Sequence, residues 1–223
     1  MKRLIRACSS TIGKKFVIAI TGLLLCGFLV VHLAGNLLLY VGPQAYNDYA
    51  RSLHEQGALL VVAEIGLLGL FLIHLFLALG IARDNWAARK TRYAVKVSKI
   101  KNRQSGIKPE NFMVVSGLIV LGFLLLHLAD MRFAMRPDID YAAFADDEAA
   151  RTMAVLATPL TRVVYTVGCL LLGLHLAHGF SSAFQSLGLN HPRYASLIHW
   201  IGVIFAAVIA VGFVSFPFVY FFS

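Results

Sequence analysis

Long apolar segments alternate with polar stretches along this chain. Five of them hold 20 or more residues in nearly unbroken apolar runs, at about 16–41, 58–82, 112–131, 160–187 and 197–222. A hydrocarbon core of about 30 Å is crossed by roughly 20 helical residues, so each segment is long enough to span a membrane. We therefore predict an all-α membrane protein with five transmembrane helices in one domain that covers residues 1–223.

The polar stretches between these segments predict the connections. The stretch from Gln44 to Gln56 is expected to form a short surface helix, with His54 exposed to solvent. Residues 146–156 predict a second short helix, because acidic residues in its first turn suit the helix dipole. The longest connection, residues 83–111, carries nine basic and two acidic residues and is too polar to enter a bilayer.

Composition and charge support a membrane protein and argue against a nucleic-acid-binding one. Hydrophobic residues make up 59% of the chain and charged residues 14%, outside the usual range of a soluble domain. The net charge is +9, yet 15 of the 20 Lys and Arg residues fall within residues 1–15, residues 83–111 and the loop with Arg193. This alternation places the N-terminus in the cytoplasm and the C-terminus outside. The basic loop could dock a partner protein or anionic lipid.

The apolar segments contain an internal two-helix repeat. The sequence TGLLLCGFLVVHLAG, residues 21–35, recurs as SGLIVLGFLLLHLAD, residues 116–130. A second pair is LGLFLIH, residues 68–74, and LGLHLAH, residues 172–178. Histidine recurs at the same place in each pair, inside apolar helices where ionisable side chains are costly, so we expect the function to lie there.

The predicted topology sorts these histidines into two levels. The first and third helices run outward, which brings His32 to the level of His127; the second and fourth run inward, which brings His74 to the level of His178. A four-helix bundle with two histidines at each of two levels is suited to bind two haems, each iron lying between two imidazoles. Haems with both axial positions filled carry electrons. We predict an outer pair, His32 and His127, and an inner pair, His74 and His178.

His175 is an alternative to His178, because residues three apart share a helix face. The repeat aligns His178 with His74 and His175 with Phe71, so we assign the inner haem to His178. His175 is then expected beside the ligands, or as the ligand in its place.

Other uses of intramembrane histidines remain open. A histidine can hydrogen-bond one helix to another. Zinc would need cysteine or carboxylate ligands to complete each pair, and Cys8, Cys26 and Cys169 show no paired metal spacing. A proton or ion transporter would also use His and Glu, although its helices are commonly interrupted by Gly and Pro.

Glu64 is the carboxylate that lies well inside a predicted helix, at the level of the outer pair. An ionised, unpaired carboxylate is expensive there, so we expect Glu64 to be protonated, hydrogen-bonded or in a wet cavity. An acid in a first helical turn, favoured by the dipole, is the alternative.

Several motifs resemble one family, the di-haem cytochrome b subunit of succinate:quinone oxidoreductases in its five-helix, single-subunit form. The most specific is HLAHGFSSAFQSLGLNHPRY, residues 175–194. The others are SSTIGKK with ITGL, HLAGNL, AYNDYA with the following Glu64, His74 with ARDNWAARKTRY, and SGLIVLGFLLLHL.

The resemblance implies an enzyme complex in a bacterial cytoplasmic membrane. It implies two haem b groups, a flavoprotein subunit with covalent FAD that interconverts succinate and fumarate, and an iron–sulfur subunit on the cytoplasmic face. The chain would pass electrons between the iron–sulfur subunit and a membrane quinone, menaquinone rather than ubiquinone, and Glu64 would serve quinone proton transfer near the outer haem. A di-haem anchor of a hydrogenase or formate dehydrogenase is the alternative.

Overall fold

The computed structural model describes residues 10–88, 109–189 and 191–221, and within these ranges every regular element is a helix. Cys8 and most of the predicted basic loop lie outside the described residues. Five helices are long and apolar enough to span a membrane, as predicted.

The five long helices are α2 (Thr11–Asn36), α5 (Ala58–Ala87), α6 (Pro109–Met131), α8 (Pro159–Ser186) and α9 (Pro192–Ser215). Two short elements, α3 (Leu38–Val41) and η2 (Phe216–Phe221), continue α2 and α9.

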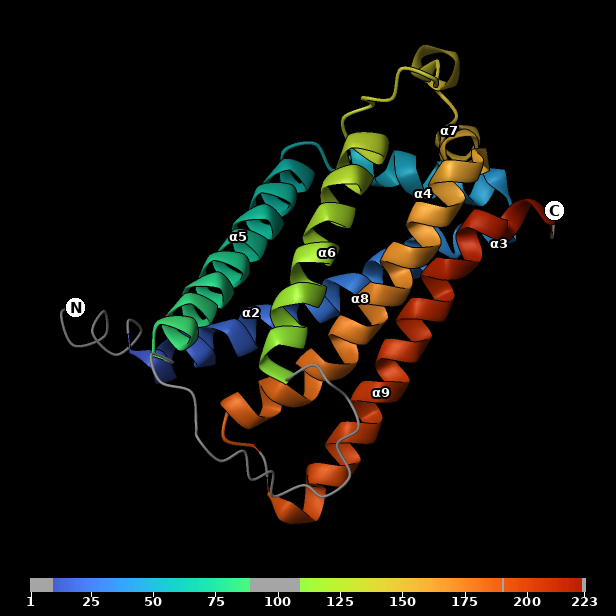
Figure 1. Cartoon of the computed structure of the whole chain (residues 1–223). Helices are drawn as coiled ribbons and strands as arrows, with labels where there is room; N and C mark the ends of the chain where they lie inside the picture. Colours follow the sequence, from blue (N-terminus) through green and yellow to red (C-terminus); the bar gives the residue numbers. More distant parts are fainter. Residues whose placement is uncertain (1–9, 89–108, 190, 222–223) are drawn as a thin grey trace.

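Consecutive long helices run in opposite directions (Figure 1). We call the end where α2, α6 and α9 begin the proximal end. At the opposite, distal end lie two short helices, α4 (Pro43–His54) and α7 (Glu148–Ala157). These are the two short helices expected from the polar connections. The 3-10 turn η1 (Tyr141–Phe144) lies on the chain between α6 and α7.

The most extensive packing joins α8 to α9, and glycine allows close approach there. A Cβ atom on Gly173 would lie 2.6 Å from the Ala210 Cβ. Burial is uneven across the bundle: 28% of the spanning stretch is buried in α8, against 6% in α5 and in α6. The faces of α5 and α6 are therefore open to lipid or to a bound group.

An ion pair joins α2 and α5 at the proximal end. Lys14 Nζ lies 2.8 Å from Asp84 Oδ2. The helix α5 continues to Ala87, beyond the predicted end at residue 82, and this pair gives its polar last turns a partner on α2.

The distal helices α4 and α7 hold each other through a polar contact. Asn47 donates to Asp147 at 2.9 Å and accepts from the Ala149 backbone N–H at 2.8 Å. Asp147 is also the N-cap of α7, so this helix begins later than the predicted residue 146. The bonds from the Ala150 N–H and from Asn47 hold the pKa of Asp147 below its usual value.

Candidate functional site

The structure brings His32 of α2 and His127 of α6 together. Their ring centroids are 5.9 Å apart, with the rings edge to face. Aromatic side chains surround them: Phe28 stacks on His32 at 5.3 Å, and Tyr165 lies 5.8 Å from His127. The predicted outer pair is thus adjacent in space and set among apolar rings.

His74 of α5 points at the first residues of the repeat on α2. Its Nδ1 atom lies 3.1 Å from the Thr21 hydroxyl. A Cβ atom on Gly22 would lie 3.1 Å from the His74 Cε1, closer than an ordinary contact, so glycine makes room for the ring.

The second half of the repeat makes the same contact with His175. The His175 Nδ1 atom lies 3.0 Å from the Ser116 hydroxyl, and a Cβ on Gly117 would lie 3.3 Å from the His175 Cε1. The Thr-Gly and Ser-Gly pairs are equivalent in the repeat, so the structural counterpart of His74 is His175.

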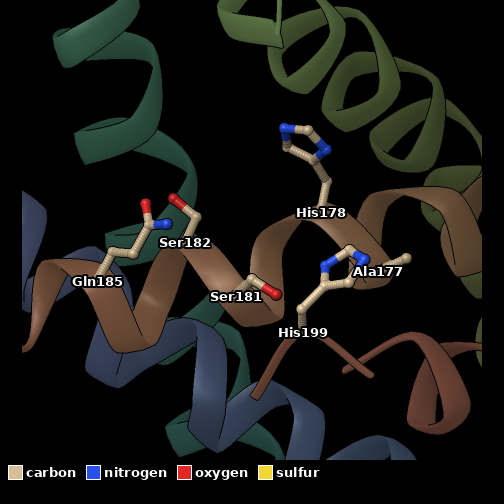
Figure 2. Close-up of a pocket in the computed structure, with 6 residues that line it drawn as sticks. All are labelled: Ala177, His178, Ser181, Ser182, Gln185 and His199. Carbon is tan, nitrogen blue, oxygen red and sulfur yellow. The ribbon is translucent and has the colours of Figure 1, made fainter. Parts of the chain in front are cut away.

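His178 faces a different environment, one helical turn nearer the proximal end. It is exposed, and its nearest ring partner is Phe112 at 5.8 Å. Figure 2 shows it on a polar stretch of α8 beside a pocket of about 230 Å³ between α8 and α9. Polar side chains that line this pocket with His178 are Ser181, Ser182, Gln185 and His199. The assignment of His178 as a ligand stays a prediction, and these contacts favour the alternative, His175.

Glu64 forms an ion pair at the distal end. Its carboxylate lies 3.0 Å from the Arg132 guanidinium, with side chains 40% and 61% exposed. As the seventh residue of α5 it lies beyond the first turn. It also lines an open, groove-like cavity of about 470 Å³ whose other lining residues are apolar or glycine: Leu24, Phe28, Leu60, Ala63, Gly66, Leu67 and Leu70. The expected hydrogen-bonded carboxylate is present, and its partner is a residue that the sequence did not indicate.

A second carboxylate, Asp130, was also missed. It is 9% exposed at the end of α6 and accepts a hydrogen bond from the Tyr165 hydroxyl at 3.0 Å. Tyr165 therefore lies between Asp130 and the ring of His127. In the sequence Asp130 is the last residue of the repeat segment and stands next to the end of the predicted helix 112–131, where a carboxylate can reach the membrane surface.

His54 is exposed and lies on α4, where its Nδ1 is 2.8 Å from the Ala50 carbonyl oxygen. This agrees with a solvated side chain.

The donor set fits a bis-imidazole haem site better than a zinc site. Across the described ranges, no group of three or more His, Cys, Asp or Glu side chains gathers as a metal site, whereas His32 and His127 lie side by side, and His74 and His175 make matching contacts in the two halves of the repeat. A haem iron takes two axial protein ligands, while structural zinc takes four. Beside Gly27 and Gly122, which lie between the two levels in the repeat, a Cβ atom would meet nothing within 4 Å.

Comparison of the chain with known protein families, with curated proteins and with solved structures finds no match in any of the three.

Proposed function

We propose that this chain is the membrane-anchor and electron-transfer subunit of a succinate dehydrogenase or fumarate reductase complex, and that it binds two b-type haems. The observation that supports this best is the repeated placement of histidines at two levels of the bundle. The sequence motifs around these histidines, which resemble the di-haem cytochrome b family, also support it.

In this proposal His32 and His127 hold the outer haem, and His74 with His175 or His178 holds the inner one. The contacts of His175 make it the better candidate. A haem bound by two imidazoles supplies one-electron transfer. The chain contributes the four imidazoles and the apolar surroundings, such as Phe28 and Phe123, that exclude water from the outer pair.

The cavity beside Glu64 is the proposed quinone site. Its apolar walls suit an isoprenoid quinone, and the single carboxylate at its edge can give or take a proton. Arg132 holds the Glu64 carboxylate in place.

The proposed partners follow from the resemblance. An iron–sulfur subunit would dock on the proximal, cytoplasmic end and carry electrons between this chain and a flavoprotein with covalent FAD. The complex would lie in a bacterial cytoplasmic membrane, where the exposed apolar faces of the five helices contact lipid. The chain is then part of an enzyme whose dicarboxylate chemistry takes place on another subunit.

The visible spectrum of the purified complex tests this proposal. We expect two b-type haems per chain, together with covalent FAD in a copurifying subunit. Two haems with a hydrogenase or formate dehydrogenase partner instead of FAD would favour the alternative anchor. A colourless complex would contradict both and favour a transporter.

Histidine variants test the pairing of ligands. His32→Ala and His127→Ala should each remove one and the same haem, and His74→Ala the other, because each iron then keeps a single protein ligand. His54→Ala is the matched control and should keep both. Loss of one haem on both His32→Ala and His74→Ala would contradict the two levels.

The inner ligand is decided by two further variants. On the contacts we expect His175→Ala to lose the inner haem and His178→Ala to keep it. The reverse result would show that the alignment of the repeat motifs, and not the hydroxyl contact, identifies the ligand.

A further inference from the structure

Two buried hydroxyl groups each contact at least one backbone carbonyl oxygen of their own helix and an imidazole. Thr21 Oγ1 lies 2.8 Å from the Val17 carbonyl oxygen, 3.1 Å from that of Ile18 and 3.1 Å from His74 Nδ1. Ser116 Oγ lies 3.2 Å from the Met113 carbonyl oxygen and 3.0 Å from His175 Nδ1. Thr21 is 5% exposed and Ser116 3%, so neither hydroxyl depends on solvent for its hydrogen bonds.

The number of protons then decides the tautomer of each ring. A hydroxyl has one hydrogen to donate, and a backbone carbonyl can only accept. When the hydroxyl of Thr21 or Ser116 donates to its own helix, as hydroxyls in helices commonly do, the bond to the imidazole has to come from the ring. Nδ1 therefore carries the proton, and the Nε2 lone pair is left free for a metal.

We propose that Thr21 and Ser116 are positioning residues that fix the tautomer and the orientation of His74 and His175, so that both rings present Nε2 to the inner haem iron. This inference rests on the proposed haem function. Gly22 and Gly117 follow the hydroxyl residues and leave room for the rings. One hydroxyl-glycine pair in each half of the repeat thus orients one ligand of the same haem.

The bond from Nδ1 also changes the ligand itself. An imidazole that donates its Nδ1–H becomes more basic at Nε2 and stabilises the oxidised iron. The outer pair is built differently. The nearest polar group to His32 Nδ1 is the Asn36 amide at 3.5 Å, the limit of a hydrogen bond, and the hydrogen bonds of the described residues include none to the His127 ring. Removal of either hydroxyl should therefore act on the inner haem alone.

The test replaces each hydroxyl without changing the ligand. Thr21→Val keeps the shape of the side chain and removes the hydroxyl, and Ser116→Ala removes the other. Thr21→Ser keeps the hydroxyl. Ser215→Ala is the matched control, because the Ser215 hydroxyl donates to the Gly212 carbonyl oxygen at 2.6 Å and contacts no histidine.

The purified complex is titrated potentiometrically while the visible spectrum is recorded, and the oxidised haems are examined by electron paramagnetic resonance. We expect Thr21→Val and Ser116→Ala to raise the midpoint potential of the inner haem and to shift its g values, or to lose that haem. The outer haem should not change. Thr21→Ser should behave like the unmodified chain.

Three results would overturn the inference. The first is an inner haem that is retained with unchanged potential and g values in both hydroxyl variants. The second is an equal shift in Ser215→Ala. The third is loss of the haem in Thr21→Ser as well as in Thr21→Val, which would make packing the cause. In all three cases the unmodified complex still holds two haems and the proposed function stands. A colourless unmodified complex would instead contradict both the proposed function and this inference.

Discussion

Glu64 and Arg132 form the polar pair at the edge of the proposed quinone cavity. Glu64→Gln keeps the shape and a hydrogen bond to Arg132 but cannot exchange a proton. Because general acid–base catalysis typically contributes about 10²- to 10⁴-fold, we expect quinone-linked turnover to fall within that range while both haems remain. The measurement compares quinone-linked with dye-linked succinate oxidation in the same preparation.

The matched control is Glu55→Gln, an exposed carboxylate at the same end of the bundle that caps α4. It should leave both activities unchanged. Normal quinone-linked turnover in Glu64→Gln, with both haems present, would leave the pair with Arg132 as a purely structural contact between α5 and the end of α6.

Asp147 links α4 to α7 and gives a pH-dependent contribution to stability. The hydrogen bonds to its carboxylate lower its pKa in the folded protein. The stabilisation is therefore complete above the pKa of the unfolded chain, about 3.9, and is lost as the pH falls through the lower folded value. Asp147→Ala removes the N-cap, which should cost about 0.5–2 kcal/mol, and thermal unfolding followed by circular dichroism measures this.

The pH dependence separates Asp147 from its neighbour. Between pH 5 and 3 the midpoint of thermal unfolding should fall further in the unmodified protein than in Asp147→Ala. Asp146→Ala, which alters an exposed acid one residue earlier, should behave like the unmodified protein. Parallel curves for Asp147→Ala and the unmodified protein would show that Asp147 contributes nothing to the acid response.

At the site, the sequence predicted that histidines meet at two levels but not which contacts orient them. The motif LGLFLIH matches LGLHLAH with His74 over His178, whereas the contacts to Thr21 and Ser116 match His74 with His175. The alignment of the two motifs rests on their apolar residues, which do not report how far each helix is shifted along its axis. A small difference in that shift moves the histidine that contacts the hydroxyl by one helical turn. The pairing of Glu64 with Arg132 was not predictable, because it joins side chains on different helices across the fold.

Helix packing is most constrained between α8 and α9. An added methyl group on Gly173 would meet the Ala210 Cβ, which belongs to the neighbouring helix and can move only if that helix moves. We expect Gly173→Ala to destabilise the protein by about 1–3 kcal/mol despite the better helix propensity of alanine. Thermal unfolding in detergent measures the change.

Gly80→Ala in α5 is the control, because a Cβ atom there meets nothing within 4 Å. It should be neutral or slightly stabilising. Equal effects of the two substitutions would show that the α8–α9 contact is no tighter than the open face of α5.

The helices themselves were largely predictable, since apolar runs of this length form few structures other than membrane-spanning helices. The ends were not. Polar residues 83–87 looked like a loop, yet they continue α5, and Asp84 there pairs with Lys14 on α2. Whether a polar segment forms another helical turn depends on such a distant partner, which the local pattern does not contain.

At the scale of the whole molecule, burial is greatest on α8, followed by α2 and α9, and is least on α5 and α6. His74 of α5 and His127 of α6 are half-buried and face α2, where they contact Thr21 and His32. The exposed residues of α5 and α6 therefore lie on other faces of these two helices than the histidines.

The orientation of the molecule gives the last prediction. An odd number of spanning helices predicts that the segments before α2 and after α9 lie on opposite sides of the membrane, and the distribution of basic residues predicts that the proximal end faces the cytoplasm. Single cysteines are introduced in a chain without Cys8: Gln56→Cys in the turn between α4 and α5, and Leu189→Cys between α8 and α9. Both sites are exposed, whereas Cys26 and Cys169 lie inside long helices. A membrane-impermeant thiol reagent applied to intact cells, with the outer membrane opened where one is present, should label Gln56→Cys at once. It should label Leu189→Cys only after the cytoplasmic membrane is opened. The two cysteines differ in the end of the bundle that carries them, so the order of labelling reports which end faces outside. The opposite order would show that the distal end faces the cytoplasm, and the proposed iron–sulfur partner would then dock there, against α4 and α7.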